Sequence, residues 1–212
     1  MLRGRTGGGP PFLWRDSPES RHGLRQGPSA GLRLWYNALM ATPPIDKTLF
    51  ERLLQADALG IRLEIVGGLP MWEASPVLRH QEAVDRIRAS IRRPLPQSSA
   101  AGRCDCYHAA DVYVVFADGS LKRPDIAIYC RRPDESDEAI TLLPEAVIEI
   151  ISKGYEAKDL EIGPRFYLSQ GVKDVVVFDP HTLLVLHLTP AAVERHVSPV
   201  DITLACGCAC RV

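Results

Sequence analysis

The spacing of apolar residues along the chain predicts a few helices and a larger number of short strands. Apolar residues recur at helical spacing in three segments, and we expect helices at 47–59, 76–93 and 160–170. Other segments alternate apolar and polar residues or are apolar on both faces, as strands are. The expected strands are 62–66, 69–73, 111–116, 123–130, 146–151, 175–178, 183–188, 193–197 and 202–206. This order predicts a mixed α/β (α+β) fold in which helices flank one sheet.

Short polar signals mark where several of these elements begin and turn. Asp46 and Ser75 stand at helix N-cap positions, and Pro76 follows Ser75 at a first helical position. Gly67-Gly68 and Asp118-Gly119 are turn sequences, because glycine reaches positive φ without a steric penalty. We therefore expect one hairpin over 62–73 and a second that pairs 111–116 with 123–130.

The first 40 residues differ in composition from the rest of the chain. They are rich in Gly, Pro and Arg, carry six arginines against Asp16 and Glu19, and show no apolar periodicity. Such a segment cannot bury enough apolar surface to fold, so we expect residues 1–40 to be disordered and residues 41–212 to form the domain. An organelle transit segment has a similar composition. We favour the interpretation that translation begins at Met40.

Overall composition is ordinary for a soluble protein, with 46% hydrophobic and 24% charged residues. No apolar run reaches the length of a membrane span, so we expect no membrane partner. The formal net charge is −1, which gives no general basic surface for nucleic acid. DNA binding would therefore depend on a local patch, and the best candidate is the arginine-rich helix at 76–93. Its arginines are Arg79, Arg86, Arg88, Arg92 and Arg93.

Six cysteines lie between residues 104 and 210, and five of them occur in Cys-x-Cys patterns. Zinc sites usually show Cys-x-x-Cys spacing with a matching second pair, so the pattern argues against a structural zinc ion. Small, buried and reduced thiols are the favoured interpretation, and they suit a cytoplasmic location.

Two carboxylates interrupt strands that are otherwise apolar: Asp125 at the start of 123–130 and Glu149 within 146–151. An acid in a buried strand costs several kcal/mol unless it is paired, hydrogen-bonded or bound to a metal. A shared metal ion is one explanation. The alternative is that Asp125 caps its strand and Glu149 makes a structural ion pair.

The order of these elements resembles the Uma-two family of restriction endonucleases, a branch of the PD-(D/E)XK nuclease superfamily. The resemblance extends over about 45–212 and rests on Glu64, His80, Pro124-Asp125, the strand end 149–152, and Tyr167 with Gly171-Val172. It implies a restriction-endonuclease-like core and a metal-dependent endonuclease that hydrolyses DNA phosphodiester bonds. Asp125, Glu149 and Glu64 would hold Mg²⁺ or Mn²⁺, which prefer oxygen ligands. A homodimer is a further expectation.

The sequence departs from this family at the catalytic lysine. The commonest superfamily motif has lysine at the position of Ile151, and the Uma-two relatives carry it at the position of Gly163. Lys153 and Lys158 are the substitutes that we predict to be catalytic. Arg165 could stabilise charge, but an arginine does not act as a base.

Three interpretations follow. The protein is an active endonuclease, a degenerate relative that binds nucleic acid or a protein partner without cleaving, or a domain in which both acids are members of salt bridges. His80, Arg86 and Arg165 are the predicted nucleic-acid contacts, and the alternative for His80 is a core residue on an apolar helix stripe.

Overall fold

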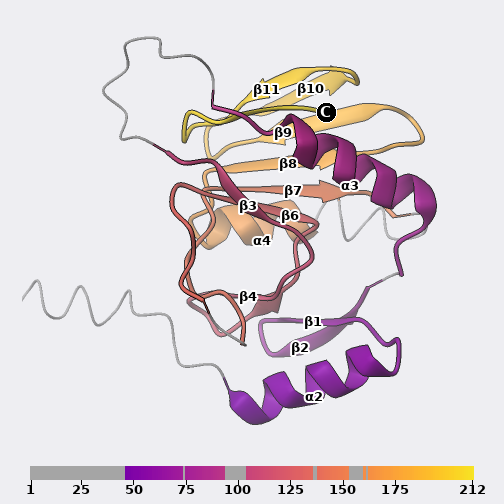
Figure 1. Ribbon diagram of the computed structural model, residues 1–212, viewed down its shortest axis with the longest axis vertical. Helices are drawn as coiled ribbons and strands as arrows, with labels where there is room; N and C mark the ends of the chain where they lie inside the picture. The colour runs from indigo at the N-terminus through magenta and orange to yellow at the C-terminus, as the bar shows by residue number, and fades with distance from the viewer. Residues whose placement is uncertain (1–45, 74, 94–103, 136–137, 153–159, 161) are drawn as a thin grey trace, which may run out of the picture. The chain divides into compact units, whose positions relative to one another are not determined.

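The computed structural model describes residues 46–73, 75–93, 104–135, 138–152, 160 and 162–212, and these contain three helices (Figure 1). The helices are α2 (Lys47–Ala58), α3 (Leu78–Ser90) and α4 (Gly163–Ser169). The predicted disordered arm at 1–40, together with Lys153 and Lys158, lies outside the described residues. Within the described part of the chain, no helix is long and apolar enough to cross a membrane.

A sheet of six strands in the order β10-β9-β8-β7-β6-β3 forms the centre of the fold. β7 and β8 are parallel, and the other neighbours in this sheet are antiparallel. Its strands are β3 (Tyr107–Ala109), β6 (Ile126–Tyr129), β7 (Ala146–Ile150), β8 (Asp174–Phe178), β9 (Leu184–Leu188) and β10 (Val193–Val197). With the helices, these strands confirm the predicted mixed α/β fold.

A second sheet has the order β2-β1-β5-β4, and a third pairs β11 with β12. Their strands are β1 (Leu63–Val66), β2 (Leu69–Trp72), β4 (Val114–Val115), β5 (Leu121–Lys122), β11 (Asp201–Thr203) and β12 (Ala209–Arg211). β1 and β2 form the hairpin that Gly67-Gly68 predicts, and both glycines have positive φ.

The two faces of the central sheet are covered by different helices. Even-numbered residues of β6 and β7, including Ile126 and Ile148, pack with the α3 residues Val84 and Ile87 in one apolar cluster. Odd-numbered residues of β7, including Val147, share the other cluster with Phe166 and Tyr167 of α4. Because successive strand residues point to opposite faces, Glu149 belongs to the face that α4 covers.

The predicted helix starts are partly confirmed. Asp46 is the N-cap of α2, and its Oδ1 accepts a hydrogen bond from the backbone N–H of Leu49. The second helix was predicted to begin at Pro76, which is wrong, because α3 begins at Leu78 and its N-cap residue Val77 has no side-chain capping bond. Val77 itself is exposed.

The second predicted hairpin is wrong in its pairing, although its turn is in place. β4 and β5 pair across Asp118-Gly119, but β5 ends at Lys122 and the chain then moves to the central sheet as β6. Pro124 lies between β5 and β6, and a proline cannot donate to a ladder of backbone hydrogen bonds. The prediction that all later strands complete one sheet is also wrong, since β11 pairs with β12.

The cysteines differ from the expectation of reduced thiols. Disulfides join Cys104 to Cys130 and Cys106 to Cys208, whereas Cys206 and Cys210 are free. These residues stand far apart in the sequence, so alternation along a single strand gave no information on which of them meet.

Candidate active site

Asp125 and Glu149 face each other at the adjacent strands β6 and β7. The register pairs Ile126 of β6 with Ile148 of β7, so Asp125, one residue before β6, lies across from Glu149. Each carboxylate accepts a hydrogen bond from the opposite strand. The N–H of Asp125 donates to Glu149 Oε2 at 3.2 Å, and the N–H of Ile150 donates to Asp125 Oδ2 at 2.7 Å. The backbone therefore fixes the position of both acids.

One side chain from each of two helices also holds this pair. From α3, His80 Nε2 lies 3.1 Å from Asp125 Oδ2. From α4, the Tyr167 hydroxyl donates to Glu149 Oε1 at 2.6 Å. Tyr167 is fully buried and His80 is largely buried, so both helices contribute ordered polar groups to the site. The structure thus brings His80, Asp125, Glu149 and Tyr167 together.

Glu64 lies in β1 and is part of a buried ion pair. Its Oε2 accepts a hydrogen bond from Lys122 Nζ at 2.8 Å, and its Oε1 accepts one from the backbone N–H of Arg123 at 2.8 Å. The side chains of Glu64 and Lys122 are only 1% and 3% exposed, whereas that of Asp125 is 23% exposed. The Lys122 ammonium also lies 5.1 Å from the centre of the Tyr167 ring. The site therefore combines the buried Glu64–Lys122 ion pair with the more exposed carboxylate of Asp125.

The electrostatics of the site raise the pKa of Glu149 in the metal-free protein. Burial first, and then repulsion from the Asp125 carboxylate, raise the pKa of Glu149 well above its ordinary value. The Lys122 ammonium and the hydrogen bond from Tyr167 oppose this rise of the pKa. Burial, followed by the charge of Glu149, also raises the pKa of Tyr167, which keeps its hydroxyl as a donor.

The three carboxylates do not close into one tight set. In the part of the chain that the structure describes, groups of three His, Cys, Asp or Glu ligand atoms that all lie within 4.8 Å of one another consist of cysteines. Asp125 and Glu149 are linked directly through the backbone of the two strands, whereas Glu64 is linked to β5 through Lys122. Asp125 and Glu149 thus form one pair of carboxylates, and Glu64 is separate from it.

The positions at which related nucleases carry lysine are filled differently here. Ile151 is buried in the apolar cluster beneath α4, and its N–H donates to the Phe178 carbonyl at 2.8 Å. Gly163 is the buried first residue of α4, and Arg165 two residues later is exposed.

The arginines of α3 do not converge on the carboxylates. Just beyond the C-terminal end of α3, Arg92 pairs with Asp201 and Arg93 pairs with Asp105, each at 2.9 Å.

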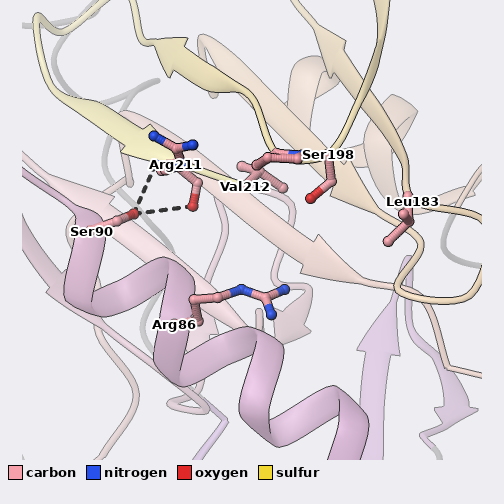
Figure 2. Close-up of a pocket in the computed structure, with 7 residues that line it drawn as sticks. Arg86, Ser90, Leu183, Ser198, Arg211 and Val212 are labelled. Carbon is pink, nitrogen blue, oxygen red and sulfur yellow. Dashed lines mark hydrogen bonds between the residues drawn. The ribbon is translucent and has the colours of Figure 1, made fainter.

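Arg86 lies at a separate pocket of about 330 Å³, also lined by Ser90, Leu183, Ser198, Pro199, Arg211 and Val212. Figure 2 shows the Arg86 side chain extending from α3 into the space below Ser198 and Val212. Of the predicted nucleic-acid contacts, His80 alone touches Asp125 or Glu149 within the described residues.

Sequence reasoning missed Lys122 and named Tyr167 without giving it a role at this site. Lys122 stands in a short strand that is buried throughout, and an ionisable residue there requires a partner for the same reason as Asp125 and Glu149 do. The contact of Tyr167 with Glu149 had no sequence signal, because it depends on how α4 packs on the sheet.

The chain matches the model of a known protein family. Residues 49–204 match the Uma2 family, whose description is "Putative restriction endonuclease". The chain belongs to this family. The match confirms the resemblance seen in the sequence, and the matched residues include Glu64, Asp125, Glu149 and Tyr167.

One solved structure similar to this chain is the crystal structure of "a putative nuclease belonging to DUF820" from Anabaena variabilis ATCC 29413. The two chains are 19% identical, the TM-score is 0.49, and the similarity covers 66% of this Uma2 protein and 80% of that chain. No curated protein matches the chain.

Proposed function

We propose that this Uma2 protein is a divalent-metal-dependent endonuclease that hydrolyses DNA phosphodiester bonds at Asp125 and Glu149. The observation that carries the proposal is the pair itself. Two carboxylates face each other across adjacent strands, are held by reciprocal backbone hydrogen bonds, and are supported by His80 and Tyr167. Ordered carboxylates with hydrogen-bonded partners are the typical arrangement around a metal ion.

The donor atoms fit Mg²⁺ or Mn²⁺. Carboxylate oxygens are the hard ligands that these ions prefer, and the partial exposure of Asp125 leaves room for water. A cation would also offset the repulsion that raises the pKa of Glu149. When bound, such an ion supplies an activated water and neutralises charge on the phosphate.

The residues of the chain have distinct roles in this proposal. Asp125 and Glu149 bind the metal, and Tyr167 and His80 hold their carboxylates in place. Glu64 is the third carboxylate, and the Lys122 ammonium balances its charge in the metal-free protein. Lys122 also supplies positive charge close to Glu149, in place of the lysine that is absent at Gly163. Lys153 and Lys158 remain candidates for the catalytic lysine.

DNA contacts are proposed for His80, Arg86 and Arg165. Arg86 and Arg165 are exposed on α3 and α4, which flank the sheet that carries the acids. Such contacts to phosphates would add affinity without sequence preference and would weaken with salt. A cytoplasmic location and a homodimer stay predictions.

One observation favours a second candidate function, a nuclease-fold protein that binds nucleic acid or a protein partner without cleaving. Lys122 is only 3% exposed and is engaged by Glu64, so its ammonium does not stand free to reach a phosphate. In that case the metal would bind and cleavage would not follow.

The deciding experiment incubates plasmid DNA with the protein and Mn²⁺ or Mg²⁺. We expect nicked or linear DNA with the unmodified protein and none with Asp125→Asn or Glu149→Gln. Glu51→Gln is the matched control, because Glu51 is exposed on α2 and takes no part in the site. Melting curves with and without Mn²⁺ separate the two functions. A rise in Tm without cleavage supports the second candidate, and superimposed melting curves contradict the metal site altogether.

A further inference from the structure

Five of the six cysteines meet at one place, although they come from three separate segments of the chain. Cys104 and Cys106 lie in the segment that leads into β3, and Cys130 immediately follows β6, the strand that pairs with β3. Cys206 and Cys208 lie in the turn between β11 and β12. The structure joins Cys104 to Cys130 and Cys106 to Cys208, and the Cys206 thiol is free.

The sulfur atoms of these residues are close to one another beyond the two disulfides. Cys104 Sγ lies 3.4 Å from Cys208 Sγ, which belongs to the other disulfide. The ligand atoms of Cys104, Cys106 and Cys208 all lie within 4.8 Å of one another, and so do those of Cys104, Cys130 and Cys206. Tetrahedral Zn²⁺ with Zn–S bonds of ~2.3 Å requires sulfurs separated by roughly 3.8 Å. Cys104 Sγ and Cys208 Sγ, which are not bonded to each other, are already near this separation at 3.4 Å, and opening the two disulfides frees the remaining sulfurs to reach it.

The backbone on both sides of the cluster is ordered by its own hydrogen bonds. In the turn of Cys206 and Cys208, the N–H of Gly207 donates to the Leu204 carbonyl and the N–H of Leu204 donates to the Cys208 carbonyl, each at 2.8 Å. Gly207 has φ of +86°, which favours glycine at the middle of this Cys-x-Cys segment. Across from it, Arg93 Nε donates to the Cys104 carbonyl at 2.8 Å. The thiols are therefore presented by fixed segments.

Disulfide pairing alone does not account for this arrangement. A fifth sulfur, that of Cys206, lies within 4.8 Å of both members of the Cys104–Cys130 disulfide. Paired disulfides use an even number of sulfurs and gain nothing from an additional thiol at that distance. A four-coordinate metal, in contrast, can take either Cys130 or Cys206 as its fourth ligand. Three of the five cysteines, Cys104, Cys106 and Cys208, are buried, as the ligands of a structural zinc site commonly are.

We propose that the reduced cluster is a zinc site, and that the disulfides and the metal-bound state are alternative forms of the same residues. Cys104, Cys106 and Cys208 bind a single Zn²⁺, and Cys130 or Cys206 supplies the fourth sulfur. The soft thiolates distinguish this site from the oxygen donors at Asp125 and Glu149.

The conversion between the two forms balances. A dithiol reductant gives two electrons and two protons to each disulfide, which becomes two cysteine thiols, while the dithiol becomes a disulfide. Zn²⁺ then binds the sulfurs as thiolates and releases the thiol protons to water. Because the ligands lie just before β3, just after β6 and in the β11–β12 turn, the metal holds these segments together when the disulfides are open.

The test uses the full chain, reduced with a dithiol and desalted without oxygen, with Zn²⁺ or Co²⁺ added. We expect the sulfurs of each reduced chain to bind a single Zn²⁺, and the Co²⁺ form to show the absorption of tetrahedral thiolate coordination. The oxidised chain should bind neither ion with thiolate absorption. Cys104→Ser should weaken zinc binding at least tenfold, since Cys104 belongs to both sulfur groups. Cys210→Ala and Asp125→Asn are the controls and should bind zinc as the unmodified protein does.

Protection from alkylation provides a measurement that needs no variant. Zn²⁺ should protect Cys104, Cys106, Cys208 and one further cysteine of the reduced chain, as read by mass spectrometry. Absence of both protection and thiolate absorption in the reduced chain overturns the proposal. Equal zinc binding by the oxidised chain, or loss of zinc in Asp125→Asn alone, also overturns it, because the ion would then bind at the carboxylates.

Discussion

Replacing Lys122 by methionine removes the ammonium group that lies 2.8 Å from the Glu64 carboxylate. Methionine keeps an unbranched apolar side chain beside the rings of Phe166 and Tyr167, so packing changes little. Glu64, which is 1% exposed, then carries its charge without that ammonium. Removing one member of a buried ion pair costs about 3–5 kcal/mol.

The lower end of that range applies here. Glu64 keeps its hydrogen bond from the backbone N–H of Arg123, so we expect a loss of about 3 kcal/mol in the free energy of unfolding. At roughly 2–4 °C per kcal/mol for a chain of this size, the Tm should fall by roughly 6–12 °C. The double variant Lys122→Met/Glu64→Gln removes both charges and should recover most of the loss, which gives a coupling of about 2 kcal/mol.

Urea unfolding of the metal-free protein measures these values, with Lys47→Met as the matched control. Lys47 forms an exposed pair with Glu138 at 3.5 Å, and such pairs contribute about 0–1 kcal/mol. Mn²⁺ adds a second measurement. If Glu64 is a metal ligand, Mn²⁺ should raise the Tm of Lys122→Met more than that of the unmodified protein, because the ion replaces the missing cation. A Lys122→Met protein within 1 kcal/mol of the control variant would refute the reasoning from burial.

Three further predictions concern the carboxylate pair of Asp125 and Glu149. Because the folded-state pKa of Glu149 is raised, the unfolded chain loses this proton first, and the stability of the metal-free protein should fall as pH rises above about 4.5. Glu149→Gln should lack this part of the pH dependence, and equal slopes in urea titrations across pH would contradict it. Tyr167→Phe removes a donor that lowers the pKa of Glu149, so Mn²⁺ binding, followed by Tm, should require a higher pH. His80→Leu should weaken Mn²⁺ binding about 10–100-fold, as loss of a partner to a ligand does, and unchanged affinity would make His80 a core residue only.

The sequence predicted the carboxylate pair because burial of an acid is costly wherever it occurs. Asp125 and Glu149 were recognised from the apolar residues around them, and their placement on adjacent strands required only that neighbouring strands pair. The same local reasoning predicted the cap at Asp46 and the hairpin at Gly67-Gly68. These features depend on residues that are close in sequence or on one strand-to-strand contact.

The rest of the site depends on contacts that a linear pattern does not contain. Lys122 and Glu64 are 58 positions apart and meet because β1 and β5 pair at Ile65 and Leu121. The cysteine pairings span up to 102 positions. Pro124 was a local signal against a continuous strand over 123–130, and it was outweighed by the apolar run that follows it.

The relation between Lys122 and Ile151 explains how a cation reaches this site without a lysine on β7. A lysine at Ile151 would share the α4 face of the sheet with Glu149, two residues earlier on the same side. In this chain Ile151 fills that position within the apolar cluster of Phe166 and Tyr167. Lys122 approaches the same two rings from β5, with its Nζ 5.9 Å and 5.1 Å from their centres. Its charge lowers the pKa of Glu149, so it acts on the same carboxylate. The positive charge near Glu149 therefore comes from Lys122 in the second sheet, and the ion pair with Glu64 keeps the Lys122 ammonium in place.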